Sequence, residues 1–327
     1  MSRDAQSGAV GGQITLLGAI AAVCRHPNET VALATVELTE LLIRGLAVVV
    51  FVVSSTLGVG LALTVGQILA PRKNARLVVL SLAANFVLAP LAALGLWRAL
   101  GLDEPLGIGL LLCGLAAGAP FLIKLAEFAK ADLAFAVGLM VLLMVVTVVY
   151  LPLALPFLLE GITVNPAKIA QSLVVLMLIP LAVGLLLRAR RPGAAGRIRP
   201  AVGLLSNVSM ILVVLLTMAG HFRSVLSVFG TFGVLAAVVY TVVCVGIGWL
   251  LGGPGRSTRG VLALGTAQRN AAAAFVVAGQ NFDDAKVIVM ITVVLIVEFL
   301  MLLPFARMLA RGRASAGAAD PKTEQEQ

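Results

Sequence analysis

Long apolar runs follow one another along most of the chain and are separated by short polar segments. An apolar run of about 20 residues is long enough, as a helix, to cross the hydrocarbon core of a bilayer. The pattern predicts nine membrane-spanning helices, at residues 38–63, 77–100, 105–129, 133–158, 168–189, 201–220, 229–252, 259–280 and 285–309. A shorter, glycine-rich run at residues 10–23 leaves a tenth span as an alternative.

These spans define the expected organisation of the chain. We expect an all-α membrane protein with one polytopic domain over residues 38–309. Residues 1–37 precede this domain and would contain the additional short helix, whereas residues 310–327 are expected to form a disordered cytoplasmic tail. The composition agrees, because 60% of the residues are hydrophobic and only 12% are charged. This balance excludes a soluble globular protein.

The distribution of basic residues predicts the orientation in the membrane. The formal net charge of +9 would by itself also suit a nucleic-acid-binding protein. The cations, however, concentrate in alternate loops, and the loops between them carry acids. This is the positive-inside pattern of a multi-pass protein with a cytoplasmic C-terminus. We expect it in a plasma membrane, the inner membrane of a bacterium, with the lipid bilayer and a small solute as partners and no nucleic acid.

Two spans carry polar residues near their middle, where each must find a partner because water is absent. In the third span, Pro120 has no amide donor and predicts a kink or break near residues 118–120. Lys124 and Glu127 lie three residues apart, so they share one helix face and can form a pair. The alternative interpretation places these two charges at a solvated edge of the membrane.

The eighth span places Thr266, Gln268, Arg269 and Asn270 among apolar residues. An arginine at the bilayer centre costs about 3 kcal/mol, so such residues normally face a wet cavity, an acid or a ligand. The second span adds Asn85, and the ninth adds Glu298, the candidate partner of Arg269. A purely structural ion pair between Arg269 and Glu298 is the alternative to a functional role.

The two interrupted spans stand five positions apart in the order of spans, so the second has the opposite orientation. Such spacing indicates an inverted repeat whose broken helices cross near the middle of the membrane. Broken helices expose amides at one end and carbonyls at the other, which can hold an anion or a cation. The predicted substrate or coupling site consists of Arg269, Lys124, Asn270, Gln268, Thr266, Asn85, Glu298, Glu127 and Pro120.

Several segments in this order resemble the bile acid:sodium symporter family, over residues 57–309. They are LGVGLAL at 57–63, ANFVLAP at 84–90, GAP at 118–120, FAKADLA at 128–134, GIGWLLG at 246–252 and QRN at 268–270. The resemblance implies nine or ten spans in a panel domain and a core domain, with two discontinuous helices crossing in the core. It also implies transport by alternating access.

The departures from the family pattern fall on its sodium ligands. Sodium-using members carry Thr-Ala-Ser-Asn in the third span, where this chain has Pro-Phe-Leu-Ile at 120–123. The family's hydroxyls early in the fourth span fall on Ala136 and Met140, and its second-span glutamine becomes Asn85. Because sodium is held by oxygen ligands, the apolar replacements remove part of its usual site.

The eighth span departs in the same way. The family's glutamate falls on Gly265, its glutamine on Arg269, and its asparagine is kept as Asn270. One inserted residue would instead put Gln268 in the place of the glutamine. We expect that a fixed positive charge, from Arg269, Lys124 or both, replaces the ion, so that sodium is not required.

The prediction is therefore a secondary transporter of a small organic anion. Arg269 could instead bind a carboxylate or sulfonate of the substrate directly. Glu127 or Glu298 could exchange protons, since burial favours a neutral carboxyl and a nearby arginine favours a charged one. The alternative functions are a sodium-dependent symporter with shifted ligands and a non-transporting receptor or assembly subunit. No enzyme, cofactor or metal motif occurs in the sequence, so catalysis is not expected.

Overall fold

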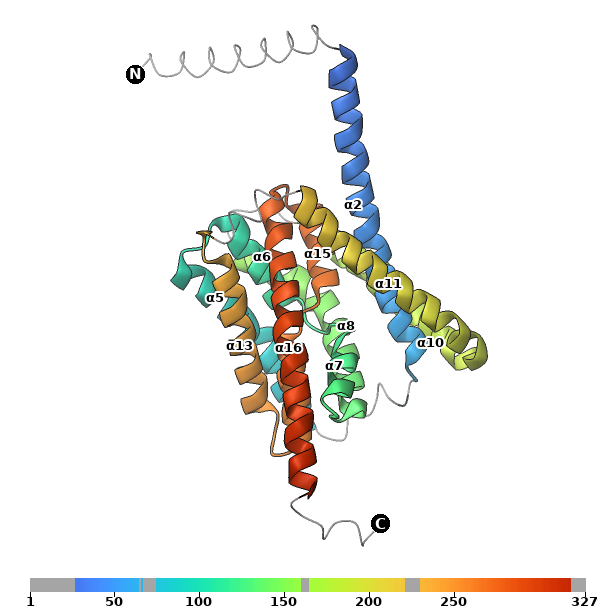
Figure 1. Cartoon of the computed structure of the whole chain (residues 1–327), viewed down its shortest axis with the longest axis vertical. Helices are drawn as coiled ribbons and strands as arrows, with labels where there is room; N and C mark the ends of the chain where they lie inside the picture. The colour runs from blue at the N-terminus through green and yellow to red at the C-terminus, as the bar shows by residue number, and fades with distance from the viewer. Residues whose placement is uncertain (1–26, 65, 67–74, 160–164, 221–229, 319–327) are drawn as a thin grey trace. The chain divides into compact units, whose positions relative to one another are not determined.

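The computed structural model describes residues 27–64, 66, 75–159, 165–220 and 230–318, and the regular structure in these ranges is helical (Figure 1). Within them, eight helical stretches are long and apolar enough to cross a membrane, and one further apolar helix is shorter. The expected all-α membrane architecture is therefore confirmed. The apolar run at 10–23, the candidate tenth span, lies outside the described residues.

Helix α2 (Pro27–Ala62) begins before the predicted first span at residue 38. Pro27 is its first residue, a position that proline favours because an amide there would have no helical partner. The chain divides into two compact units, residues 1–46 and 47–327, and the boundary lies inside α2. The contacts described below belong to the second unit.

Two of the long helices contain a single π-helical turn that the apolar pattern did not predict. The first helix runs through α4 (Ala75–Ala83), η2 (Ala84–Leu88) and α5 (Ala89–Leu100), and the second runs through α9 (Pro166–Leu173), η3 (Val174–Leu178) and α10 (Ile179–Arg190). Pro90 and Pro180 follow directly, and each lacks an amide donor. One carbonyl near the first π turn, that of Phe86, accepts a hydrogen bond of 2.6 Å from the Tyr150 hydroxyl.

The two predicted breaks are present. The third span consists of α6 (Glu104–Leu115) and α7 (Leu122–Phe128), and the eighth consists of α14 (Arg256–Ala267) and α15 (Ala271–Asn281). Helix α6 packs against α15 and α7 packs against α14, so the two broken stretches run in opposite directions. They meet at the breaks, where the Asn270 amide donates to the Ala116 carbonyl at 2.9 Å.

The remaining helices surround the breaks (Figure 1). They are α8 (Leu133–Leu158), α11 (Pro192–Gly220), α13 (Gly233–Leu251) and α16 (Ala285–Ala318). Helix α16 continues beyond the predicted end of the ninth span at residue 309 and ends at Ala318. Alanine and arginine predominate in that stretch, and both are strong helix formers.

Glycines allow the backbones to approach closely around the breaks. Gly118 has a φ of +82°, and a Cβ atom there would lie 2.3 Å from the Met144 amide nitrogen of α8. Gly60 of α2 and Gly184 of α10 face each other, and a Cβ atom on Gly60 would lie 2.9 Å from the Gly184 Cα atom. Glycine at these positions fixes where the first break rests and how α2 packs on α10.

Candidate functional site

Arg269 lies at the break between α14 and α15, with only 1% of its surface exposed. A guanidinium has five N–H donors in a fixed fork. Five hydrogen bonds leave it: Nε to Cys113 O (2.9 Å), Nη1 to Asn85 Oδ1 (2.9 Å) and Thr266 O (3.0 Å), Nη2 to Gly114 O (2.6 Å) and Asn85 O (3.5 Å). Its donors are therefore all directed at protein oxygens, and none is left for a substrate.

Three of the five oxygens around Arg269, those of Cys113, Gly114 and Thr266, come from the ends of α6 and α14, which explains the position of the charge. Cys113 and Gly114 belong to the last turn of α6, where helical carbonyls have acceptor capacity to spare, although the Cys113 carbonyl also accepts from the Ala116 amide at 3.2 Å. The C-terminal end of a helix also carries partial negative charge, which favours a cation. Asn85 of η2 completes the arrangement, because its amide nitrogen donates to Thr266 Oγ1 at 3.2 Å and to Ser81 O at 3.0 Å.

Asn270 connects the two breaks and starts α15. Its side-chain oxygen accepts from the Ala273 amide at 3.2 Å, the usual N-cap bond of a helix. Its side-chain nitrogen donates to Gly118 O at 3.2 Å. On the other side of the first break, the Thr147 hydroxyl exchanges two 3.0 Å hydrogen bonds with the Ala117 amide and carbonyl. Several backbone groups at the two breaks, which have no partner within a helix, thus form hydrogen bonds with side chains, as their burial requires.

Glu298 contacts the second break, but the expected ion pair with the Arg269 side chain is not formed. Its Oε2 atom accepts from the Arg269 backbone amide at 3.1 Å and from Gln268 Nε2 at 3.0 Å. The guanidinium itself donates to the α6 carbonyls, to Asn85 and to the Thr266 carbonyl. The buried Oε1 atoms of Glu298 and Gln268 have no hydrogen-bond partner among the described residues.

Lys124 and Glu127 form the predicted pair, with 2.7 Å between Nζ and Oε2. Their side chains are 55% and 39% exposed, so this pair is not part of the buried cluster around Arg269. Sequence reasoning placed Lys124 and Arg269 together at one site. Both residues line the cavity described below, but Arg269 is buried and Lys124 is exposed.

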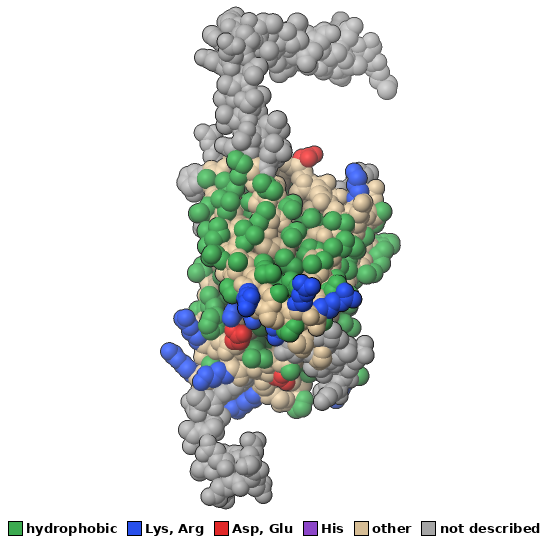
Figure 2. Space-filling view, turned by 90° about the vertical axis from the view of Figure 1, so that its right-hand side faces the viewer, with side chains coloured by type: hydrophobic (Ala, Val, Ile, Leu, Met, Phe, Trp, Pro, Cys, Tyr) green, Lys and Arg blue, Asp and Glu red, His purple; other side chains and the backbone are tan. Residues whose placement is uncertain are grey.

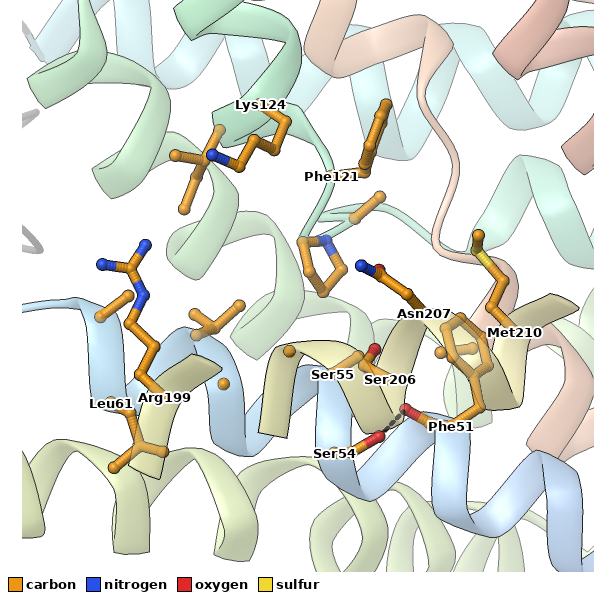
Figure 3. A pocket seen from close by; sticks show the side chains of 18 of the residues that line it. Phe51, Ser54, Ser55, Leu61, Phe121, Lys124, Arg199, Ser206, Asn207 and Met210 are labelled. Atoms are coloured by element: carbon orange, nitrogen blue, oxygen red, sulfur yellow. Dashed lines mark hydrogen bonds between the residues drawn. The ribbon is translucent and has the colours of Figure 1, made fainter. Parts of the chain in front are cut away.

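A cavity of about 720 Å³ lies beside the breaks (Figure 3). Helices α2, α10 and α11 supply lining residues on one side, and α7, α15 and α16 supply others. Pro120 and the Gln268–Asn270 segment also line it, so both breaks border the cavity. Its size is typical of a small-molecule site.

Apolar side chains surround Gly265 of α14. A Cβ atom on Gly265 would lie 3.0 Å from a methyl group of Leu122 and 3.4 Å from one of Leu139. Leu122, Ala136 and Met140 are all buried. A larger side chain at position 265 would have to displace the ends of the Leu122 and Leu139 side chains from this apolar contact between α7, α8 and α14.

Sequence reasoning missed part of the cavity lining. Helix α11 contributes Arg199, Ser206 and Asn207, and α2 contributes Ser54 and Ser55 (Figure 3). The two serines and the Ser206-Asn207 pair interrupt otherwise apolar spans, which is the signal that could have identified them. Arg199 lies between the predicted spans at 168–189 and 201–220 and was therefore interpreted as a loop residue.

Comparison with known families agrees with this architecture. The model of the sodium bile acid symporter family matches residues 47–228, more than half of the chain. A comparison with curated proteins yields no match. The matched region includes α6, α7 and the first break, and the apolar helices indicate a multi-pass integral membrane protein. The chain belongs to the sodium bile acid symporter family, a family of transporters.

Proposed function

We propose that the protein is a secondary transporter that carries a small organic anion by alternating access and does not use the sodium sites of its family. The observation that carries this proposal is the set of five hydrogen bonds from the buried Arg269 guanidinium to oxygens of α6, α14 and η2. Backbone carbonyl and amide oxygens are the ligands that hard cations use. Here a tethered cation occupies them.

The tethered charge differs from a bound ion in one respect. A guanidinium remains protonated throughout the physiological range and cannot dissociate from the chain. The ends of α6 and α14 are therefore held together whether or not sodium is present. The apolar contact of Gly265 with Leu122 and Leu139 supports the same conclusion, because it offers no oxygen ligands at the other replaced positions.

Alternating access requires two groups of helices that move against each other. We assign α2, α9–α10 and α11 to a panel domain, since α2 and α11 both contact α10. The remaining helices form a core domain around the two breaks, and the broken third span completes a set of nine spans. The cavity between these groups would be the substrate site.

One observation favours a second candidate, a symporter coupled to a proton or to sodium at a shifted position. Glu298 Oε1 and Gln268 Oε1 are buried acceptors without a partner among the described residues. Such oxygens are costly unless a donor or a cation approaches them. A proton on Glu298, or a small cation between the two side chains, would satisfy them. The exposed Glu127 is a weaker candidate for proton exchange.

Counterflow in proteoliposomes tests the proposal. The purified protein is reconstituted with unlabelled anion inside, and entry of labelled taurocholate and of smaller labelled carboxylates and sulfonates is measured with sodium or with choline as the only cation. We expect equal counterflow in both media. Counterflow that requires sodium would overturn the tethered-cation proposal and favour shifted ligands. An absence of counterflow for every anion would favour a receptor on a transporter fold.

A further inference from the structure

The cavity carries more positive than negative charge. Its lining contains Lys124, Arg188 and Arg199 as accessible cations, against Glu127 as its acid. Arg269 also lines it, but the donors of that side chain are engaged with protein oxygens. The cations that could act on a solute are therefore the three others.

These three cations differ in their engagement with the protein. Lys124 is paired with Glu127 at 2.7 Å, and Arg188 donates to the Pro192 carbonyl at 3.4 Å. The Arg199 side chain has no hydrogen bond or ion pair with any residue in the described ranges. It is exposed and lines the cavity from the first turns of α11. An uncommitted guanidinium at a cavity wall is available to an anion.

The cavity is polarised along its length. In Figure 3, Lys124 and Arg199 lie toward the same end and come from different helices, α7 and α11. Phe51 and Met210 lie toward the other end, and Asn207 is placed near them. We propose that Arg199 binds the anionic group of the transported solute, with Lys124 as a second contact. This inference rests on the proposed transport function and assigns recognition to Arg199 in place of Arg269.

The lining also indicates the shape of the solute. The guanidinium fork matches a carboxylate or sulfonate in two parallel hydrogen bonds. Ser206 and Asn207 line the cavity without a hydrogen bond from their side chains to the described residues, so they can bind a hydroxyl or carbonyl group of the solute. Phe51 and Met210 offer apolar contact at the far end. The solute is an organic anion with its charge at one end and an apolar body at the other.

Glu127 acts as an internal competitor in this arrangement. It occupies Lys124 in the empty cavity, and the anionic group of the solute must share or displace it. Removing the carboxylate would leave Lys124 free for the solute. Glu127→Gln is therefore expected to strengthen anion binding, the opposite of the effect of Arg199→Ala.

Thiol modification tests the charge at the site without knowledge of the natural solute. Ser206→Cys is treated with negatively charged 2-sulfonatoethyl methanethiosulfonate and with the positively charged trimethylammonioethyl reagent. Cys113 and Cys244 are buried, and the parent protein gives the background rate. We expect Arg199→Ala to lower the ratio of anionic to cationic modification rates by roughly tenfold, since a charged cleft raises the local concentration of counter-ions. Glu127→Gln should raise that ratio.

Arg197→Ala is the matched control. Arg197 is exposed, belongs to the same helix, lies two residues from Arg199 and does not line the cavity. The Arg197→Ala substitution removes the same charge as Arg199→Ala and should leave the ratio of modification rates unchanged. Equal ratios for Arg199→Ala and Arg197→Ala would overturn the proposal, because the effect would then be one of general surface charge.

Taurocholate counterflow separates this inference from the transport proposal. In Arg199→Ala the half-saturating concentration should rise at least about tenfold with little change in maximal rate, and Arg199→Lys should retain part of the affinity. Unchanged half-saturation in Arg199→Ala, with the parent active, would reject Arg199 as the anion contact. No counterflow by the parent with any anion would reject the transport function, whereas the thiol ratios would still decide whether Arg199 binds anions.

Discussion

A buried charge needs hydrogen-bond partners, and the Arg269 side chain has them. Its guanidinium is enclosed, yet each donor has an oxygen within hydrogen-bond reach. The sequence predicted that this buried charge needs polar partners. It could not show that Cys113 and Gly114 provide them through backbone carbonyls, because every residue has a carbonyl and only the fold selects two. The visible acid, Glu298, was for that reason assigned to the wrong part of Arg269.

Replacing Arg269 by glutamine should convert a sodium-insensitive protein into a sodium-sensitive one. A glutamine amide has two donors, so at least three of the five oxygens lose their partner, at about 1–3 kcal/mol each. We expect a lower thermal unfolding midpoint in detergent. Added sodium should raise that midpoint, because an ion bound at 100 times its dissociation constant stabilises by about 2.7 kcal/mol. The parent protein should show no sodium-dependent shift.

Arg98→Gln is the control for this change. Arg98 is exposed in the last turn of α5 and should be insensitive to both substitution and sodium. If Arg269→Gln unfolds at the same temperature as the parent, the five bonds do not stabilise the breaks. A sodium shift in the parent protein would show that a sodium site exists elsewhere.

Thr147→Val tests the support of the first break. The change keeps the shape of the side chain but removes the hydroxyl that serves both the amide and the carbonyl of Ala117. The buried Ala117 amide loses its partner and the Ala117 carbonyl keeps only a 3.5 Å bond from Asn270 Nδ2, so we expect about 1–3 kcal/mol of destabilisation. Thr241→Val is the matched control, since the buried Thr241 hydroxyl bonds only the Ala237 carbonyl within its own helix. Similar unfolding midpoints for both variants would contradict this role of Thr147.

At the scale of elements, the helix breaks had a strong local sequence signal and could be predicted, whereas the π turns had none and could not. Pro120 and the polar residues at 268–270 marked both breaks, because proline and buried polar groups cannot continue an apolar helix at no cost. The π turns at η2 and η3 add one residue to a turn without changing the apolar pattern. The way helices pack was also hidden, since a glycine in an apolar run reads the same whether it faces lipid or another backbone.

Helix α13 provides a direct test of such packing. A Cβ atom on Gly248 would lie 2.4 Å from the Leu262 carbonyl oxygen and 2.6 Å from the Ala263 Cα atom, whereas one on Gly246 would meet nothing within 4 Å. Gly248→Ala should therefore push α13 from α14, the helix that carries the Thr266 carbonyl. We expect a lower unfolding midpoint and reduced transport.

Gly246→Ala should be neutral or slightly stabilising, because alanine is favoured over glycine inside a helix by about 0.5–1 kcal/mol. Both variants can be compared by thermal unfolding in the same detergent. Equal midpoints for the two variants would show that α13 and α14 tolerate separation. Gly248 would then not be needed to position the second break.

At the scale of the whole second unit, the helix ends separate by charge. The Lys286–Asp103 ion pair, 3.3 Å between Nζ and Oδ2, places the starts of α6 and α16 at one end. The bond of 2.8 Å from the Asp132 amide to Ser257 Oγ places the starts of α8 and α14 together at the other. In Figure 2, most of the visible Lys and Arg side chains lie in the lower part of the view, below a broad hydrophobic band.

Some features of the whole molecule could be predicted from the sequence and others could not. The order of spans and the alternation of basic loops were readable, since they depend on composition along the chain. The cavity was not, because its walls combine residues from α2, α7 and α11, far apart in sequence. Arg199 is an example. Its neighbours in the sequence are typical of a cytoplasmic loop, whereas the structure places it in the first turns of α11, where it lines the cavity.

The charge separation predicts that the end bearing Arg199 faces the cytoplasm, and cysteine labelling in intact bacterial cells can test this. Arg190→Cys and Asp283→Cys each add one thiol to the three native cysteines, at exposed positions near opposite ends of the helices. By the positive-inside rule, a membrane-impermeant maleimide should label the Asp283 variant in intact cells and the Arg190 variant only after permeabilisation, with the parent protein as background. The reverse labelling pattern would show that the protein has the opposite orientation in the membrane. The anion contact proposed for Arg199 would then load from outside, so the labelling result also decides from which side the described cavity is filled.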